Sequence, residues 1–340
     1  MRVAVLGAGG AHKTEASIVR AGRALGHQCR LVNVVGWTRY AGPAAGRTMR
    51  YLVEAFQPDF LLLTRHAILA GDATLRTLLR GRTAALWYFD PQPKPAVVSL
   101  GRLVGRMYVT YLAQIDSYRA AGIEEVRFLP QGVDPATDYP AERARAHYIC
   151  DASFVGSGQY PYRHALLRAV ARACALQIRG PGWQSVSSDL PVAGGPVRGR
   201  RLRQVIRGAS ISFGASAHPE QDADRASASN RMWKILGCGG FYLGPHVGDI
   251  EHFAVGGRHC AWYRSTADAL EQLRYYLAAP EERRRIAEGG RAHALRHHTY
   301  AARLELLLAG KDYQLDPPAS DDRVVPELEH PHAGQSLDHL

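Results

Sequence analysis

Apolar residues along this chain form short continuous runs that alternate with segments of helical period. The first run spans residues 3–6, and similar runs lie within 58–66 and 83–91. Between the runs, apolar residues recur every three or four positions, as expected for helices with one buried face. Continuous apolar runs are typical of strands buried on both faces of a parallel sheet. The first part of the chain therefore predicts a doubly wound α/β domain.

The same alternation begins again after a stretch rich in proline and glycine. Pro130, Gly132, Pro135 and Pro140 cluster there, which predicts a linker within 130–150. A second parallel sheet is expected beyond it, with strands within 152–157, 176–183 and 211–216 and at 241–243.

Length and period together divide the chain into three parts. At roughly 150 residues per domain, 340 residues suggest two domains. We expect an N-terminal domain at 1–135 and a C-terminal domain at 136–310, the latter ending in residues 266–309, which are helical by period. The remainder, 311–340, contains several prolines and mostly acidic charge, so we expect a tail that is ordered only if it docks on the basic body.

The composition is that of an ordinary globular protein, and it indicates in which compartment the protein is expected. Five scattered cysteines without C-x-x-C spacing indicate neither a disulfide framework nor a zinc site. No apolar run is long enough for a membrane span, and the apolar start follows Met1 and Arg2 too directly for a signal peptide. We therefore expect a cytoplasmic protein.

The net charge of +11 is carried almost wholly by arginine, because lysine occurs only at positions 13, 94, 234 and 311. Guanidinium groups suit phosphate oxygens, so the excess agrees with a phosphorylated ligand, an anionic membrane surface or nucleic acid. Genomic base composition is an equally simple explanation of the arginine excess. The arginines are spread through every predicted helix, which disfavours nucleic acid, whereas peripheral contact with an anionic membrane stays open.

The most informative segment is 229–253. It predicts a short helix from about Asn230 to Leu236, a glycine hinge and a strand at 241–243. Arg231 and Lys234 project from the polar sides of this helix, and Gly239 and Gly240 let other groups approach the backbone. A helix start with Asn and Arg is suited to an anion.

Two further glycine loops each join a predicted strand to a predicted helix. Gly9 and Gly10 match the first half of a dinucleotide-binding fingerprint, but His12 stands where its third glycine is expected. The acidic residue expected at the end of the second strand is also missing, since Asn33 stands there. NAD binding is therefore disfavoured, and a plain tight turn is as good an interpretation. In the second half, Gly156 and Ser157 form the other loop, from which Arg163 could reach a diphosphate.

Several motifs in fixed order resemble the C-terminal module of GT-B glycosyltransferases of group 1, in the branch similar to spore-maturation protein CgeB. They are N-R-x-W-K-x-L-G-C-G-G-F at 230–241, G-D-I-E-x-F at 248–253, and the helical run at 264–303. The segments 128–135 and 151–167 also fit. The resemblance implies two Rossmann-like domains facing a cleft, with a last helix that crosses back to the first domain.

This resemblance also implies an activity. The chain would move a hexose-type sugar from a nucleotide-diphosphate donor to an acceptor, without a cofactor or metal, because fixed cations and helix starts stabilise the leaving diphosphate. The resemblance alone favours retention of configuration. The implied donor-binding residues are Gly156, Ser157, Arg163, Arg179, Gly180, Trp183, Asn230, Arg231, Lys234, Gly239 and Gly240, with Arg179 and Trp183 near the base.

On the acceptor side, the resemblance places Asp90 and His66 at carboxyl ends of strands as catalytic candidates, and Gly9, Gly10 and His12 in the cleft. Asp90 could orient or deprotonate an acceptor hydroxyl. Equally, Asp90 could cap the turn before Pro91, and His66 could be an edge histidine without a catalytic role. The triplet His298-Thr299-Tyr300 is expected to be structural.

Two departures keep other functions open. Lys234 stands where the broader family has a glutamate that accepts hydrogen bonds from the donor ribose, and Ala226 replaces a second glutamate. A noncatalytic GT-B-like module, a nucleic-acid-binding module, and an epimerase or phosphorylase therefore remain alternatives. Asp222 and Asp224 match the D-x-D of metal-dependent transferases of another fold, but so short a pattern arises by chance, and no metal is predicted.

Overall fold

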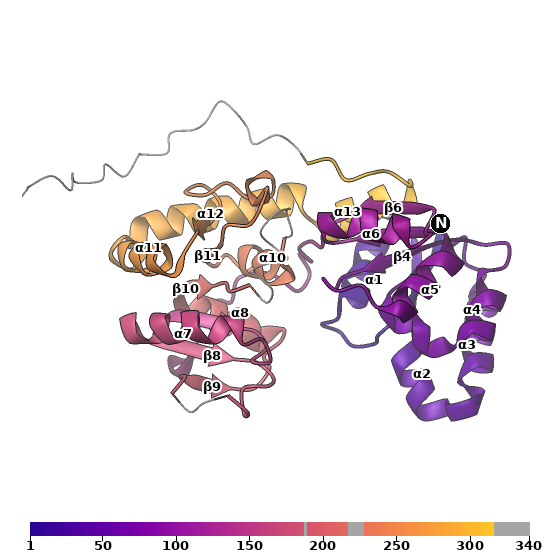
Figure 1. The fold of residues 1–340 in the computed structure, drawn as a ribbon, viewed down its shortest axis with the longest axis horizontal. Coiled ribbons are helices and arrows are strands. Elements are labelled where there is room, and N and C mark those ends of the chain that lie inside the picture. The colour runs from indigo at the N-terminus through magenta and orange to yellow at the C-terminus, as the bar shows by residue number, and fades with distance from the viewer. Residues whose placement is uncertain (187–188, 217–227, 316–340) are drawn as a thin grey trace, which may run out of the picture.

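A computed structural model describes residues 1–186, 189–216 and 228–315 of the chain. It contains two α/β domains, each built on a six-stranded sheet in which the recorded strand pairs are parallel (Figure 1). The predicted fold class, two Rossmann-like domains of the GT-B type, is confirmed. Asp222, Asp224 and Ala226, and the tail beyond residue 315, lie outside the described residues.

The first sheet has the order β2-β1-β3-β4-β5-β6. Its strands are β1 (Arg2–Gly7), β2 (Gln28–Asn33), β3 (Phe60–Leu63), β4 (Thr83–Tyr88), β5 (Arg106–Val109) and β6 (Glu125–Phe128). The helices between them are α1 (Thr14–Ala24), α2 (Val34–Ala41), α3 (Ala45–Phe56), α4 (Asp72–Leu79), α5 (Pro95–Val104) and α6 (Ile115–Ala120), with 3-10 turns η1 (Gly42–Ala44), η2 (Arg65–Ala70) and η3 (Leu112–Gln114).

The apolar runs of this domain divide their side chains between two cores. Along β1, Ala4 and Leu6 join one buried cluster, whereas Val3 and Val5 join the other. Successive side chains of a strand point to opposite faces, and helices cover both faces of the sheet. Every position in such a strand is therefore apolar, which explains why the sequence shows continuous runs rather than alternation.

The second sheet has the order β12-β11-β10-β7-β8-β9. Its strands are β7 (Cys150–Val155), β8 (Leu176–Arg179), β9 (Val192–Gly194), β10 (Ala209–Phe213), β11 (Tyr242–Pro245) and β12 (Ala261–Tyr263). The helices are α7 (Tyr162–Ala173), α8 (Arg200–Gly208), α10 (Asn230–Gly237), α11 (Thr266–Ala278), α12 (Pro280–His297) and α13 (Tyr300–Leu308), with 3-10 turns η4 (Ala146–Tyr148) and η5 (Ile250–His252).

Residues 266–309, helical by period, form three helices rather than one. Ala279 leaves helical geometry and Pro280 starts α12, because proline has no backbone N–H to continue the previous helix. Thr299 then caps α13, its side chain accepting a hydrogen bond from the amide of Ala302. The N-cap of α11 is Ser265, whose hydroxyl accepts a hydrogen bond from the Asp268 amide.

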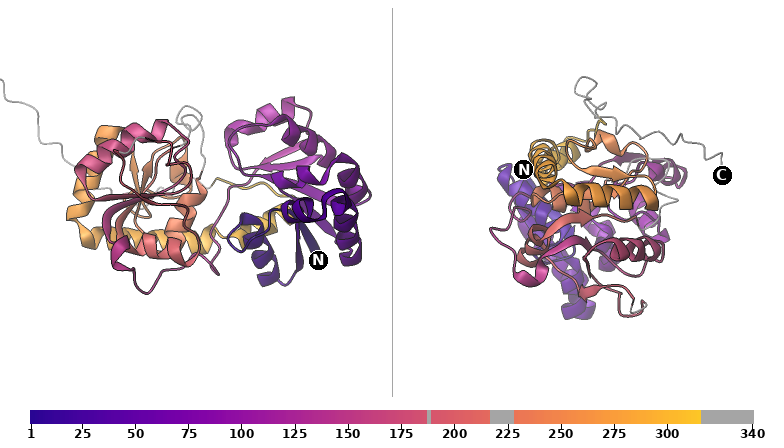
Figure 2. Two further views of the ribbon diagram at one scale, coloured as in Figure 1. Left: turned by 90° about the horizontal axis from the view of Figure 1, so that it is seen from below. Right: turned by 90° about the vertical axis from the view of Figure 1, so that its left-hand side faces the viewer.

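The chain crosses between the domains twice, and the two crossings pair with each other. The Val133 amide donates to the His298 carbonyl at 2.7 Å, and the Tyr300 amide donates to the Val133 carbonyl at 3.0 Å. Beyond this point α13 packs on the first domain, where Leu304 and Leu307 are buried. Figure 2 shows α12 and α13 running from one domain to the other. None of the described helices combines the length and apolar composition needed to cross a membrane.

Candidate active site

Two cavities lie where the domains face each other. The first, which we call the Asp90 cavity, has a volume of about 310 Å³ and takes side chains from both domains. Asp90 and Gln131 line it from the first domain, and Arg163, Asn230 and Arg231 line it from the second. The predicted catalytic aspartate and three predicted donor-binding residues therefore share one cavity.

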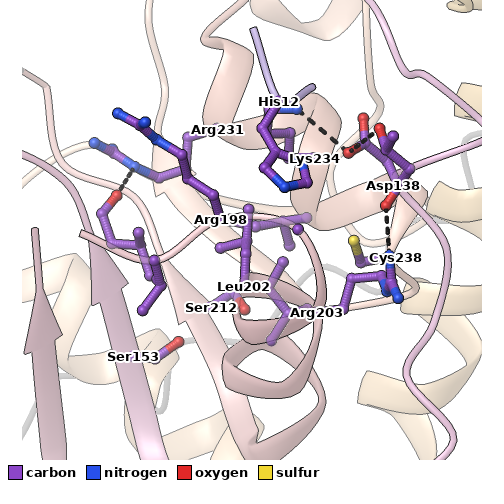
Figure 3. A pocket seen from close by; sticks show the side chains of 16 residues that line it. His12, Asp138, Ser153, Arg198, Leu202, Arg203, Ser212, Arg231, Lys234 and Cys238 are labelled. Atoms are coloured by element: carbon purple, nitrogen blue, oxygen red, sulfur yellow. Dashed lines mark hydrogen bonds and ion pairs between the residues drawn. The ribbon is translucent and has the colours of Figure 1, made fainter. Parts of the chain in front are cut away.

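The second, which we call the Lys234 cavity, has a volume of about 210 Å³. His12 reaches it from the first domain, while Lys234, Arg198 and Arg203 line it from the second (Figure 3). Much of its remaining wall is apolar, formed by Val155, Val197, Leu202, Ile206 and Ile235. A cavity with apolar walls and a few polar groups is typical of a small-molecule site.

Arg231 lines both cavities and lies at the boundary between them. Its Nε donates to the Val155 carbonyl at 2.7 Å, its Nη1 donates to the Ala215 carbonyl at 3.2 Å, and its guanidinium lies 4.6 Å from the centre of the Phe154 ring. Burial lowers the pKa of Arg231 from its ordinary value, yet an arginine side chain stays charged in proteins. Among the described residues, no carboxylate forms an ion pair with it. A half-buried cation that is held by carbonyl oxygens and an aromatic ring, without a carboxylate, suits an anionic ligand.

Asn230 offers a second sign of a ligand beside this arginine. It is the first residue of α10, whose N-cap Ser229 accepts a hydrogen bond from the Arg231 amide at 3.2 Å. Within the described part of the chain, the buried Oδ1 of Asn230 has no hydrogen-bond partner. Asn230 lines the Asp90 cavity, and an unpaired buried acceptor is costly unless a ligand satisfies it.

Lys234 is held by a carboxylate that the sequence interpretation missed. Its Nζ lies 3.3 Å from Asp138 Oδ1, and the Asp138 side chain is only 4% exposed. Asp138 also accepts hydrogen bonds from the Asp134 amide and the Thr137 hydroxyl. A sequence signal for Asp138 did exist, because a lysine in place of a buried glutamate requires a nearby carboxylate, but the spacing of 96 residues gave no way to choose it.

Arg163 occupies the first turn of α7, close to the loop that precedes it. Its Nη1 donates to the Ser157 carbonyl at 3.0 Å, and its Nε donates to the Ser216 carbonyl at 3.2 Å. The guanidinium lies 4.6 Å from the centre of the Tyr160 ring, which also lines the Asp90 cavity. Arg163 therefore adds positive charge to the cavity that contains Arg231.

In the loop at Gly156 and Ser157, two backbone amides are used within the protein, and the predicted backbone cradle stays a prediction. The Gly156 amide donates to the Arg179 carbonyl, and the Gly158 amide donates to the Pro181 carbonyl, each at 2.9 Å. Gly156 is required by close approach, since a Cβ there would lie 2.5 Å from Arg231 Nη2. The loop thus makes room for a guanidinium, and the guanidinium is the group that can bind an anion.

Arg179, Gly180 and Trp183 lie behind this loop and line neither cavity. The Trp183 ring is buried, and its indole N–H donates to the Gly156 carbonyl at 2.8 Å. Arg179 instead donates to the Ala193 carbonyl and stacks on Tyr148. Both side chains support the loop and the sheet edge, and their predicted contact with a nucleobase stays a prediction.

Gly239 and Gly240 lie at the C-terminal end of α10, roughly 12 Å of helix away from Asn230 and Arg231. Gly239 has φ 71°, which ends the helix, and a Cβ on Gly240 would lie 2.4 Å from Ile206 Cγ2. Neither lines the two cavities described above, and here they end the helix and permit close packing, while their predicted contact with the donor stays a prediction.

In the first domain, Asp90 forms an ion pair with Arg65 at the edge of the Asp90 cavity. His66 follows Arg65 but lines neither cavity; its Nδ1 lies 3.2 Å from Glu15 Oε1. Asp90 is therefore the one of the two catalytic candidates that faces the space shared with Arg231, whereas His66 contacts a buried carboxylate.

The glycine loop after β1 is held by two side chains. The Gly9 amide donates to Asn33 Oδ1 at 2.8 Å, and the Ala8 amide donates to Glu15 Oε1 at 3.1 Å. Gly10 has φ 123° and forms the turn. Of the three predicted cleft residues, only His12 lines a cavity, where it lies against Gly199. The amide of Gly9 is thus used within the domain.

Comparisons with known proteins agree with this geometry. Residues 163–309 match the family model described as "Glycosyl transferase-like". Among curated sequences, none matches the chain. Similar solved structures include a glycosyltransferase from Rickettsia africae ESF-5 (9% identity, 91% of this chain and 97% of that chain covered, TM-score 0.62) and sucrose-phosphate synthase from Thermosynechococcus elongatus (13% identity, 91% and 98% covered, TM-score 0.62). Anabaena Alr3699/HepE, solved in complex with UDP and glucose, is also similar (10% identity, 91% and 99% covered, TM-score 0.62).

At these identities the structural likeness establishes the GT-B fold, and the family match identifies a glycosyltransferase-like domain that contains Arg163, Asn230, Arg231 and Lys234. Because the family model covers less than half of the chain, sugar transfer by the chain stays a proposal. The narrower resemblance to the CgeB-like branch stays a prediction.

Proposed function

We propose that this chain transfers a sugar from a nucleotide-diphosphate donor to an acceptor hydroxyl, with the diphosphate bound at Arg231. One observation supports this most strongly. Arg231 is a half-buried cation without a carboxylate partner in the described part of the chain, and it lies at the boundary of two cavities. A diphosphate is the part of such a donor that lies between its nucleoside and its sugar, so one arginine could bind it while the two ends enter different cavities.

The residues that line each cavity suggest which end of the donor enters which cavity. The Lys234 cavity has apolar walls suited to a nucleoside, and Asp138 supplies there a carboxylate that can accept hydrogen bonds from ribose hydroxyls. Asp138 would thereby replace the family glutamate whose position Lys234 occupies. The Asp90 cavity would receive the sugar, where Asn230 Oδ1 could accept from one of its hydroxyls.

The proposed chemistry is a substitution at the anomeric carbon. The acceptor oxygen forms a new bond to that carbon, the bond from the carbon to the diphosphate oxygen breaks, and the electron pair leaves with the diphosphate. Arg231 and Arg163 would stabilise the charge that develops there, as fixed cations do in an enclosed site. The hydroxyl proton would pass to Asp90, or to the departing phosphate oxygen. Retention of configuration and independence from metal remain part of the proposal, as does the predicted cytoplasmic location.

The test is a thermal-shift panel of UDP-, GDP-, TDP- and ADP-sugars, with and without a chelator. A donor that binds only the folded protein stabilises it by about 2.7 kcal/mol at one hundred times its Kd. We expect at least one donor to raise the melting temperature equally in both conditions. No shift with any donor would favour the noncatalytic alternative. A shift that the chelator abolishes would favour a metal site, for which Asp222 and Asp224 are the candidates.

A donor that binds should then be hydrolysed or transferred. We expect slow release of the nucleoside diphosphate in the absence of acceptor, measured by a coupled assay, and faster release when the true acceptor is added. Binding without any release, across a panel of sugar and lipid-linked acceptors, would leave a binding module as the better description.

A further inference from the structure

We infer that α2, η1 and α3 form a docking surface for an anionic phospholipid membrane. This surface, which we call the α2–α3 hairpin, lies at the far end of the first domain, beyond its sheet (Figure 1). The inference does not rest on the proposed transferase activity, since it uses residues that line neither cavity.

Large apolar side chains are exposed on this hairpin to an unusual degree. Tyr40 is 80% exposed and Tyr51 is 70% exposed, while Val35 and Trp37 are each more than a third exposed. Leu69 of the adjoining η2 is 51% exposed, and η2 contacts α2 through the Thr38 hydroxyl, which lies 3.4 Å from the Leu69 carbonyl oxygen. Of the eight residues of α2, only Val34 is buried. A helix with so little buried surface has an unsatisfied apolar area, which marks an interaction site.

The charge of the hairpin is mostly positive, because its one acidic residue, Glu54, lies near the end of α3. Arg39, Arg47 and Arg50 fall within it, and residues 31–53 contain no acidic residue. The turn at its tip, Gly42–Ala44, carries no charge and lies between Arg39 and Arg47. An uncharged tip can enter the headgroup region while the flanking arginines bind anionic phosphates, each contributing roughly 1 kcal/mol near such a surface in known cases.

The mixture of residue types favours lipid over a sugar polymer. Tyrosine and tryptophan concentrate at membrane–water interfaces, where the ring is buried and its polar tip stays wet. A polysaccharide could stack on these rings but would leave the exposed aliphatic groups of Val35 and Leu69 in water. Lipid acyl chains would cover them. The guanidinium of Arg39 lies 5.7 Å from the centre of the Tyr40 ring, so charge and ring are presented together.

The first experiment is sedimentation of the full chain with vesicles. It compares phosphatidylcholine alone with phosphatidylcholine containing phosphatidylglycerol. We expect binding to the anionic vesicles, reduced at least about tenfold by the triple change Arg39→Gln, Arg47→Gln and Arg50→Gln. The matched control changes Arg200, Arg201 and Arg207 to Gln; these are exposed on α8 and alter net charge by the same amount. Equal losses in both variants, or no binding by the unchanged protein, would overturn the inference.

The second experiment uses tryptophan fluorescence as a local probe. All five tryptophans lie within the described residues, and Trp37 is the one that is exposed, at 36%, because Trp87, Trp183, Trp233 and Trp262 are buried. Anionic vesicles should therefore shift the emission to the blue, and Trp37→Phe should abolish the shift while circular dichroism stays unchanged. Binding with an unshifted spectrum would place the contact elsewhere. A shift produced by a soluble acidic polysaccharide but not by vesicles would assign the hairpin to that polymer instead.

Discussion

The two domains each begin with a strand, a glycine loop and a helix, but the two loops have different surroundings. After β1, the amides of Ala8 and Gly9 donate to the side chains of Glu15 and Asn33. After β7, the amides of Gly156 and Gly158 donate to backbone carbonyls. These four amides are therefore used within the protein. The two loops differ in the side chain that fills the space beside the glycine, which is an asparagine in the first domain and an arginine in the second.

A glycine in such a loop indicates that another group lies close to the backbone, and the identity of that group determines what the loop can bind. A Cβ on Gly9 would lie 2.4 Å from Asn33 Nδ2, and a Cβ on Gly156 would lie 2.5 Å from Arg231 Nη2. The first contact closes the loop onto its own domain. In the second, a cation is brought to the boundary of two cavities. We therefore expect damage to the first loop to affect stability, and damage to the second to affect ligand binding.

The largest expected effect on binding is that of Arg231→Ala. Removal of a charge-assisted hydrogen bond to phosphate should weaken nucleotide binding by about 1.5 to 3 kcal/mol, which corresponds to roughly 10-fold to 150-fold in Kd. Isothermal titration with the donor from the thermal-shift panel would measure it. Arg274→Ala, an exposed arginine on α11, is the matched control and should bind as the unchanged protein does. Unaltered affinity in Arg231→Ala would remove this residue from the site.

Glu15→Gln should affect only the first loop. The Glu15 carboxylate is buried and accepts hydrogen bonds from Ala8, Thr64 and His66, so loss of its charge should lower the free energy of unfolding by about 1 to 3 kcal/mol. Denaturant titration would measure this change. Nucleotide affinity should stay the same, since Glu15 lines neither cavity. A large change in affinity with normal stability would mean that the first loop binds the ligand after all.

The stabilisation that the Glu15 carboxylate provides should depend on pH. Burial alone would raise the pKa of Glu15, but its hydrogen bonds from His66, Ala8 and Thr64 outweigh burial and hold the pKa below its usual value of 4.5. The stabilisation is therefore complete above pH 4.5 and is lost as pH falls through the lower pKa of the folded protein. The difference in unfolding free energy between Glu15→Gln and the unchanged protein should shrink in acid, and a constant difference would contradict this account.

The smallest effects are expected from a matched pair, Gly9→Ala and Gly156→Ala. Each adds one methyl group at a tight contact, with Asn33 for Gly9 and with Arg231 and the buried Phe154 ring for Gly156, so we expect a cost of about 1 kcal/mol or slightly more. For Gly9→Ala this cost should appear in thermal stability with the donor Kd unchanged. For Gly156→Ala it should appear as a several-fold weaker Kd, because Arg231 moves. Identical behaviour of the two variants would remove the distinction between the loops.

Much of this molecule is determined by the sequence alone. The apolar runs at β1, β3 and β4 predict parallel strands, because side chains in a strand covered on both faces are mostly apolar. Helical period and glycine punctuation then predict the two α/β units, and the motif N-R-x-W-K identifies the helix that carries Arg231. These features depend on residues near one another in the chain, so pattern alone is sufficient.

Only the tertiary structure decided which candidates meet in one site. Asp138 and Lys234 are 96 positions apart, and no local pattern relates them. Trp183 and Gly240 have the residue types of a binding loop, yet both are buried by packing within the second domain. The direction of a side chain depends on which distant element lies against it, and a sequence pattern describes the near neighbours of a residue rather than the distant ones.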